Sequence, residues 1–289
     1  MNEKAKVITS AAIKGGVGKT TISFNVGCYL ARQGKKVLLI DLDHQASMTS
    51  NYHFNDTQKV MSDMTEIFAD AYDTSIKDTK IRPMKIDENL YGLSTSDSLD
   101  KSGNLFMGMN SGVFVLHRYL NFIGAKDDYD YIIIDTHPDF NLATENAIVC
   151  ADILLIPIQG SSYSFDSILK MQSKYNELQK SIIDINGNSY VNAQIIYFGN
   201  LVEFNTASSH QFIKDMQETD GFVGYLHKRE AFVSSEKKYF VLDYLNNKME
   251  SASKKNTKSA EKEYTRASKA YTEISSQLDN LCKAFQQLG

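Results

Sequence analysis

The stretch Lys14-Gly15-Gly16-Val17-Gly18-Lys19-Thr20-Thr21 decides the fold of this 289-residue chain. Residues 7–13 just before it are apolar enough to form a buried strand, and residues 21–32 just after it carry apolar side chains at helical spacing. Glycines allow the backbone to curl around an anion with its N–H groups pointing inward, and the helix that follows adds its positive end. The stretch therefore predicts a phosphate-binding loop between a strand and a helix.

Individual side chains of this loop have expected roles. Lys19 should reach the terminal phosphates of a nucleotide, and the Thr20 hydroxyl should ligate Mg²⁺. The ordinary motif has a glycine five residues before Gly18, where this chain has Ile13, and a second lysine, Lys14, follows. A chance glycine-rich turn is the alternative, and an eight-residue match between a strand and a helix argues against it.

Acidic residues end two of the expected strands. Residues 36–41 read as a buried strand that leads into Asp41 and Asp43, and residues 129–135 read as a central strand that ends in Asp135. Carboxylates two residues apart on an extended chain point to the same side. The carboxyl ends of strands in open α/β sheets are where ligands bind, and Mg²⁺ prefers oxygen ligands. Solvated turns that happen to be acidic are the alternative.

Together, the two-lysine loop, these acids and Pro138 resemble the deviant Walker A ATPases of the ParA/MinD family, most of all a short plasmid-partition ParA. The resemblance implies Mg²⁺-dependent hydrolysis of ATP to ADP and phosphate, with ATP and Mg²⁺ as cofactors. It implies that Asp43 orients the attacking water and that Lys14 crosses to the phosphates of a second subunit. His44 departs from the family, which has proline there.

The residue sets that follow from the resemblance are these. The catalytic set is Lys14, Lys19 and Asp43, and the metal set is Thr20, Asp41 and Asp135. The nucleotide set is Lys14, Gly15, Gly16, Val17, Gly18, Lys19, Thr20 and Thr21, with His227 and Arg229 from a late loop beside the adenine. His227 replaces the proline usual in that late loop.

Further strands are expected at residues 89–96, 153–159, 193–200 and 222–226, with helices between them. This alternation predicts an α/β P-loop NTPase fold with a mostly parallel, twisted sheet and helices on both faces. Residues 51–88 read as a surface insertion with a short helix near 61–68. Residues 1–247 would form the ATPase domain.

Residues 248–289 are expected to form a C-terminal helical extension that packs on the same domain. Apolar residues recur in it at three- and four-residue spacing, from Tyr264 through Ala267, Tyr271, Ile274, Leu278, Leu281 and Phe285 to Leu288. Cations gather near its start in a chain whose net charge is −4. Such a run can be a plain solvated helix face or a surface for DNA phosphates. The DNA hypothesis takes in Lys228, Arg229, Lys254, Lys255, Lys258, Lys262, Arg266 and Lys269.

Three functions compete within this family. A partition ATPase would form a homodimer on ATP binding, bind DNA of any sequence and respond to a small centromere-binding ParB-type protein, with no membrane partner. A MinD-like cell-division ATPase would need a basic amphipathic C-terminus, whereas residues 277–289 carry Lys283 as their only cation. A reductase or metal-cluster carrier would need paired cysteines, and Cys28, Cys150 and Cys282 are scattered. The sequence favours a cytoplasmic, nucleoid-associated partition ATPase.

Overall fold

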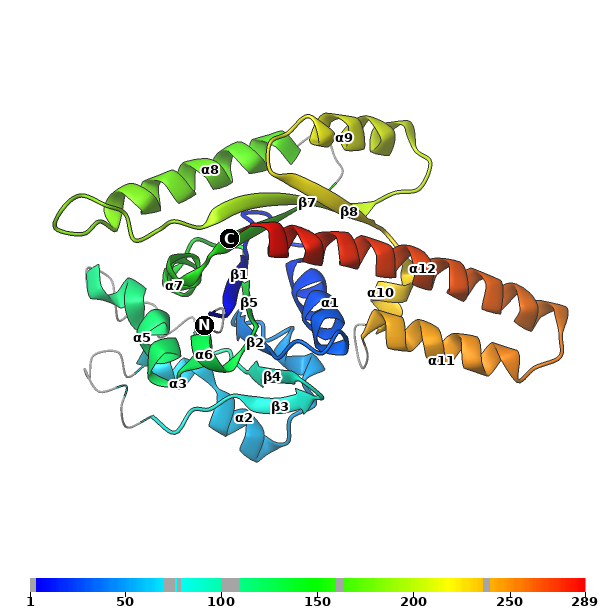
Figure 1. Cartoon of the computed structure of the whole chain (residues 1–289), viewed down its shortest axis with the longest axis horizontal. Coiled ribbons are helices and arrows are strands. Elements are labelled where there is room, and N and C mark those ends of the chain that lie inside the picture. The colour runs from blue at the N-terminus through cyan, green and yellow to red at the C-terminus, as the bar shows by residue number, and fades with distance from the viewer. Residues whose placement is uncertain are drawn as a thin grey trace.

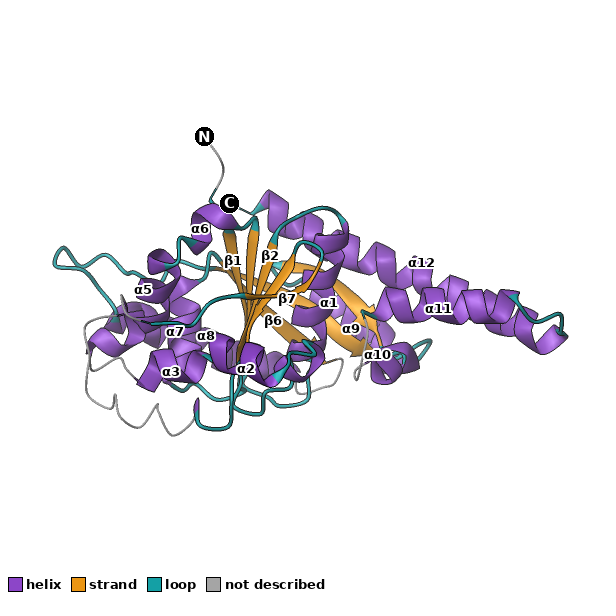
Figure 2. Ribbon diagram, turned by 90° about the horizontal axis from the view of Figure 1, so that it is seen from below, coloured by secondary structure: helices purple, strands orange, loops and turns teal. Residues whose placement is uncertain are grey.

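The computed structural model describes residues 4–69, 76, 79–99, 110–159, 164–235 and 240–288. Its centre is an eight-stranded sheet with the order β3-β4-β2-β5-β1-β6-β7-β8, in which β3 alone runs antiparallel to its neighbour (Figures 1 and 2). The strands are β1 Lys6–Ser10, β2 Val37–Leu42, β3 Met84–Asp87, β4 Leu90–Leu93, β5 Tyr131–Thr136, β6 Ile153–Gln159, β7 Gln194–Val202 and β8 Phe222–His227. The predicted parallel α/β sheet is confirmed.

Helices cover both faces of the sheet (Figure 2). They are α1 Lys19–Arg32, α2 Asp56–Ser62, α3 Met64–Ala69, α5 Val115–Phe122, α6 Ala125–Asp128, α7 Leu142–Cys150, α8 Ser164–Ser181, α9 Ala207–Gln217, α10 Glu230–Ser235, α11 Val241–Ser253 and α12 Lys258–Gln287. Helices α1, α11 and α12 share one apolar core with the sheet, and α3, α5 and α7 share a second on its other face. A third cluster joins α8 and α9 to β6 and β7. Within these residues, no helix is both long and apolar enough to cross a bilayer.

The strand order reverses at β1, which lies between β5 and β6. Chain connections leave this point toward opposite edges of the sheet, so a crevice opens at the carboxyl end of β1. Ser10 pairs with Asp135 in β5, and Asp135 in turn pairs with Asp41 in β2. The register therefore brings both predicted strand-end acids next to the loop that leaves β1.

The segment 51–88 was predicted to be a surface insertion, and its described part is exposed over residues 55–57 and 59–61 but contributes other side chains to the core. Met64, Ile67, Phe68 and Ile81 are all buried at 4% exposure or less within the core under α5. The segment ends in β3, the antiparallel edge strand. Short helices with irregular apolar spacing gave no periodic pattern, so their burial depends on tertiary packing that the sequence did not reveal.

The C-terminal region folds into two antiparallel helices rather than the single helix expected from residue 248. Helix α11 ends at Ser253, and Thr257 caps α12 by accepting a hydrogen bond from the Ala260 N–H, at 3.2 Å. We call this α11–turn–α12 unit, residues 241–287, the hairpin. Its turn projects beyond the edge of the sheet (Figures 1 and 2).

The apolar stripe of α12 packs on the body, as predicted. Ile274, Leu278, Leu281 and Phe285 are fully buried in the core shared with α1. Tyr264 departs from the prediction, because it is 44% exposed on the projecting part of the hairpin. The N-terminal part of α12 thus projects beyond the core, and its C-terminal part is packed into the core.

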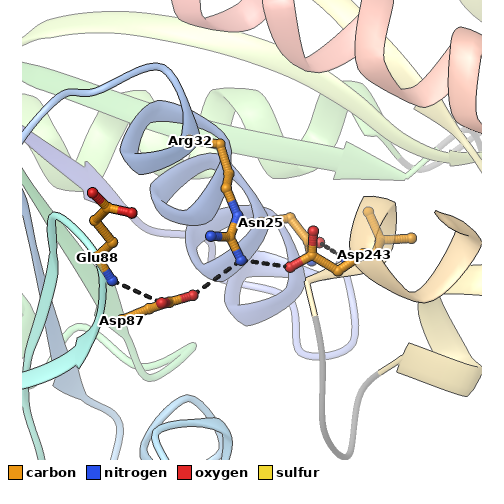
Figure 3. Close-up of polar contacts among 6 residues, drawn as sticks. Asn25, Arg32, Asp87, Glu88 and Asp243 are labelled. Carbon is orange, nitrogen blue, oxygen red and sulfur yellow. Dashed lines mark hydrogen bonds and ion pairs between the residues drawn. The ribbon is translucent and has the colours of Figure 1, made fainter. Parts of the chain in front are cut away.

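Helix α1 is tied to the start of the hairpin by two polar contacts (Figure 3). The Val241 N–H donates to Asn25 Oδ1 at 3.0 Å in a buried bond. Arg32 Nη2 lies 3.0 Å from Asp87 and 2.7 Å from Asp243, and all three side chains are at least 36% exposed. Exposed ion pairs of this kind contribute only about 0–1 kcal/mol each. The buried Asn25 bond is therefore the stronger constraint between α1 and the hairpin.

Candidate nucleotide site

The loop before α1 has the backbone of an anion-binding turn. Gly16 and Gly18 have φ values of 75° and 83°, in the left-handed region that glycine adopts without strain. Gly18 caps α1, which begins at Lys19. Asn200, at the carboxyl end of β7, donates from Nδ2 to the Val17 carbonyl at 2.8 Å and holds the loop from its far side. The loop is thus fixed in the shape predicted from its glycines.

A pocket of about 360 Å³ and another of about 630 Å³ open beside α1, and the larger one contains the P-loop. We call the larger one the P-loop pocket. Loops at the carboxyl ends of β1, β2, β5 and β7 contribute to its walls. Its lining includes Gly16, Gly18, Lys19, Thr20, Thr21, Phe24, Asn25, Asp43, Gln45, Ser47, Ser50, Asn51, His137, Pro138, Leu201 and Phe232.

Of the predicted metal residues, Thr20 lines the P-loop pocket, while Asp135 and Asp41 are fully buried on adjacent strands. The Thr20 hydroxyl donates to Asp135 Oδ2 at 2.6 Å. Asp41, in the neighbouring strand, accepts from the Thr49 N–H and hydroxyl, both at 2.7 Å, and from the Asp43 N–H at 3.1 Å. Thr20 and Asp135 therefore form a close hydroxyl and carboxylate pair, and Asp41 is the register partner of Asp135 on the neighbouring strand.

Burial sets the electrostatics of these acids. It raises the pKa of Asp135 to about 8, with the Asp41 charge adding to the effect, and it raises the pKa of Asp41 to about 6, against hydrogen bonds from Thr49 that lower it. Two adjacent buried carboxyls are costly to ionise together. A divalent cation bound by Asp135 would favour its carboxylate form, so the donor set fits Mg²⁺.

Lys19 and Asp43 both line the P-loop pocket. Lys19 is 6% exposed, and burial lowers its pKa, while the charges of Asp135 and Asp43 oppose that shift. Asp43 is 7% exposed and accepts from the Gln45 N–H at 2.9 Å, which fixes its loop after β2. A buried ammonium and a buried carboxylate in one pocket are suited to a bound phosphate and a positioned water.

Lys14 lies apart from the walls of the P-loop pocket. Lys14 is exposed, and it lines a separate small cavity with residues of β6. Lys19, Thr20 and Asp43 therefore line one pocket, and Lys14 does not.

His227 and Arg229 do not line the P-loop pocket. His227 stacks on Phe204 with ring centroids 3.9 Å apart, and its Nδ1 lies 3.1 Å from the Val202 carbonyl. Arg229 forms an ion pair with Glu273 of α12, and its guanidinium lies over the Phe204 ring. These contacts join the end of β8 to α12, and an adenine contact by either residue stays a prediction.

The predicted DNA residues lie on and beside the hairpin. Lys254, Lys255, Lys258, Lys262, Arg266 and Lys269 are all exposed. Lys262 and Arg266 line a groove of about 580 Å³ together with Lys228, Arg229 and Lys248. Glu230 and Glu263 line it as well, and Lys248 lies 3.7 Å from Glu263. The groove thus holds five cations and two acids.

Several residues at or beside the P-loop pocket were not predicted from the sequence, among them Asn200, Leu201 and Phe232. Asn200 holds the loop, and Leu201 and Phe232 supply apolar wall on the side of β7 and α10. A polar residue at the carboxyl end of a parallel strand was the available signal for Asn200. Nothing in the local sequence indicated Phe232, because its α10 has six residues and reaches the pocket only through tertiary packing.

Comparison with known proteins agrees with this geometry. The family described as an AAA domain matches residues 5–188, more than half of the chain. The sporulation initiation inhibitor protein Soj of Bacillus subtilis is 34% identical over 179 residues, which cover 61% of this chain and 67% of Soj. The chain belongs to the ParA/MinD family of P-loop ATPases.

Further relatives of this ParA-family chain are partition proteins. The chromosome partitioning protein ParA of Caulobacter vibrioides is 28% identical over 180 residues, covering 61% of this chain and 64% of that protein, just under two thirds. A Borrelia burgdorferi protein described as a plasmid partition protein, solved with AMPPNP bound, has a TM-score of 0.68 and 25% identity. That structural match covers 84% of this chain and 96% of the Borrelia chain.

Proposed function

We propose that this protein is an ATP-dependent DNA partition ATPase. ATP and Mg²⁺ bind at the P-loop pocket and join two chains face to face, and the dimer binds DNA without sequence preference. A small DNA-bound ParB-type protein stimulates hydrolysis and release, in the cytoplasm on the nucleoid. The observation that carries this proposal is the convergence of Lys19, Thr20 and Asp43 on one pocket, with Lys14 exposed outside it.

Catalysis in this proposal rests on positioning and charge. Lys19 contacts the terminal phosphates, and Asp43 holds the attacking water. Thr20 and Asp135 would hold Mg²⁺, which supplies neutralisation of the developing phosphate charge. The hydrogen bond between the Thr20 hydroxyl and Asp135 Oδ2, at 2.6 Å, supports this assignment.

Lys14 is the residue through which each subunit would act on the nucleotide bound to the other. A lysine that is exposed and outside its own P-loop pocket can meet the phosphates of a facing chain, much as an arginine finger is supplied in trans.

The domain assignment, with residues 1–247 as the ATPase and 248–289 as an extension, stays a proposal. Helix α11 begins at Val241, so that boundary falls inside a helix.

Packing of the C-terminus disfavours the MinD-like alternative. A membrane-binding helix needs a free apolar face. Leu278, Leu281 and Phe285 are fully buried against the sheet and α1, so the apolar side of this stretch is already covered. Lys283 is 2.7 Å from Asp279, which offsets its charge.

Replacing Asp43 with alanine should leave ATP binding near the wild-type level while slowing hydrolysis about 100-fold or more, the scale on which a positioned proton acceptor contributes. The variant should accumulate as an ATP-bound dimer. Single-turnover hydrolysis and binding of a fluorescent ATP analogue, measured side by side, check this. Wild-type turnover in the variant would assign the water-positioning role to another residue.

DNA binding is assigned to the hairpin, helped by Lys228. Lys228 lies 3.7 Å from Glu203, but both side chains are at least 60% exposed, so that pair contributes little and can exchange for a phosphate. Arg229 is engaged by Glu273. The exposed cations of the turn and outer α12 are therefore the main candidates, and dimerisation would double the number of phosphates they meet.

Simultaneous replacement of Lys254, Lys255 and Lys258 by alanine should weaken binding to random-sequence DNA and flatten its salt dependence. Each lost phosphate contact removes about 0.9 from the slope of log affinity against log salt. A matched control replaces Lys170, Lys174 and Lys180, which are exposed on α8 of the opposite face. Fluorescence anisotropy at several salt concentrations measures both variants. An equal loss of DNA affinity in both variants would mean that net charge, and not the hairpin surface, causes the effect.

A further inference from the structure

Two histidine rings contact each other beside the P-loop pocket, and one of them, His137, lines it. His44 follows β2, and His137 follows β5. Because β2 and β5 are neighbours in register, their following loops leave the sheet side by side. The two rings lie 4.3 Å apart between centroids, with an angle of 36° between their planes. Neither ring is needed by the nucleotide chemistry proposed above.

Asp43 completes a three-residue cluster with this pair. One nitrogen of each ring and one carboxylate oxygen of Asp43 all lie within 4.8 Å of one another. Two imidazoles and a carboxylate are the ligand set of open zinc-type sites, in which a water takes the fourth position. Mg²⁺ and Ca²⁺ prefer oxygen ligands alone. The donor chemistry therefore selects a divalent transition metal.

The surroundings of the cluster favour a cation. Among the residues that the structure describes, His44 Nδ1 is buried without a hydrogen-bond partner, an unfavourable condition for a polar atom. Asp139 Oδ2 lies 3.3 Å from His137 Nδ1 and adds negative charge behind that ring. Lys19, whose charge interacts with Asp43 and Asp139, is the cation that opposes metal binding.

We propose that Asp43, His44 and His137 bind a divalent transition metal of the zinc class, separately from the Thr20 and Asp135 pair. A metal on the Asp43 carboxylate removes that group from the attacking water. Zinc therefore slows ATP hydrolysis without displacing ATP, a consequence that rests on the role proposed for Asp43. Metal binding itself depends only on the cluster.

Titration of nucleotide-free protein with Co²⁺ tests the site apart from any ATPase activity. We expect visible d–d absorption that saturates at one ion per chain, persists in excess Mg²⁺ and is displaced by Zn²⁺. His44→Gln and His137→Gln should each lower the affinity at least tenfold. His210→Gln is the control, because His210 is exposed on α9 and should leave the affinity unchanged.

A second substitution, His137→Asn, and thermal melts of every variant separate ligand loss from misfolding. If the wild type shows no saturable cobalt absorption, or if the folded His44 and His137 variants bind like the wild type, the two rings are a packing pair only and the proposal fails. ATP hydrolysis with and without Zn²⁺ tests the consequence. Zinc that binds the wild type without slowing hydrolysis would overturn the inhibitory role.

Discussion

Lys19→Ala should abolish measurable nucleotide binding. Lys19 is the buried cation of the P-loop pocket, at 6% exposure. Hydrogen bonds to charged groups contribute about 1.5–3 kcal/mol each, and an ammonium that meets two phosphates makes more than one of them. The expected loss is therefore roughly 100-fold or more in affinity. Equilibrium binding of a fluorescent ATP analogue measures it.

The control for this experiment is the neighbouring lysine. Lys14→Ala removes the same charge from the same loop but lies outside the pocket wall, so monomer binding should stay close to wild type. Thermal melts establish that both variants fold. Near wild-type affinity in Lys19→Ala would remove the assignment of the loop to nucleotide binding.

Lys14→Ala has a different expected effect, which is the loss of ATP-dependent dimerisation and of turnover. The reason is that its ammonium is exposed and would neutralise phosphate charge in the facing chain rather than its own. An arginine finger supplied in trans contributes about 10³- to 10⁵-fold to the rate, which sets the scale of the expected loss. Light scattering with ATP and Mg²⁺ measures the mass. A variant that still dimerises and hydrolyses normally would refute the face-to-face arrangement.

Local chemistry made much of the site predictable from sequence. Glycine spacing fixed the loop, because Gly16 and Gly18 need the left-handed backbone that they adopt. Strand-end acids were predictable because parallel strands bring their carboxyl ends to one edge, and Asp41 and Asp135 are register partners. The buried stripe of α12 was predictable from the spacing of its apolar residues, because that spacing does not depend on where the helix begins.

The features that escaped prediction depend on contacts between distant segments. The break between α11 and α12 has neither glycine nor proline, and only Thr257 marks it by capping the second helix. Asn200 donates a hydrogen bond to the carbonyl of Val17, which lies 183 residues earlier in the chain. His44 contacts His137 because β2 and β5 are neighbours in the sheet. That strand order cannot be read from any single stretch of sequence.

Co-sedimentation of the wild-type protein with plasmid DNA and with anionic liposomes, each with and without ATP and Mg²⁺, tests the central claim most directly. A partition ATPase should sediment with DNA of unrelated sequence when ATP is present, lose that binding as salt rises, and stay in the supernatant with liposomes. Sedimentation with liposomes in place of DNA, or DNA binding that is equal without ATP, would contradict the account.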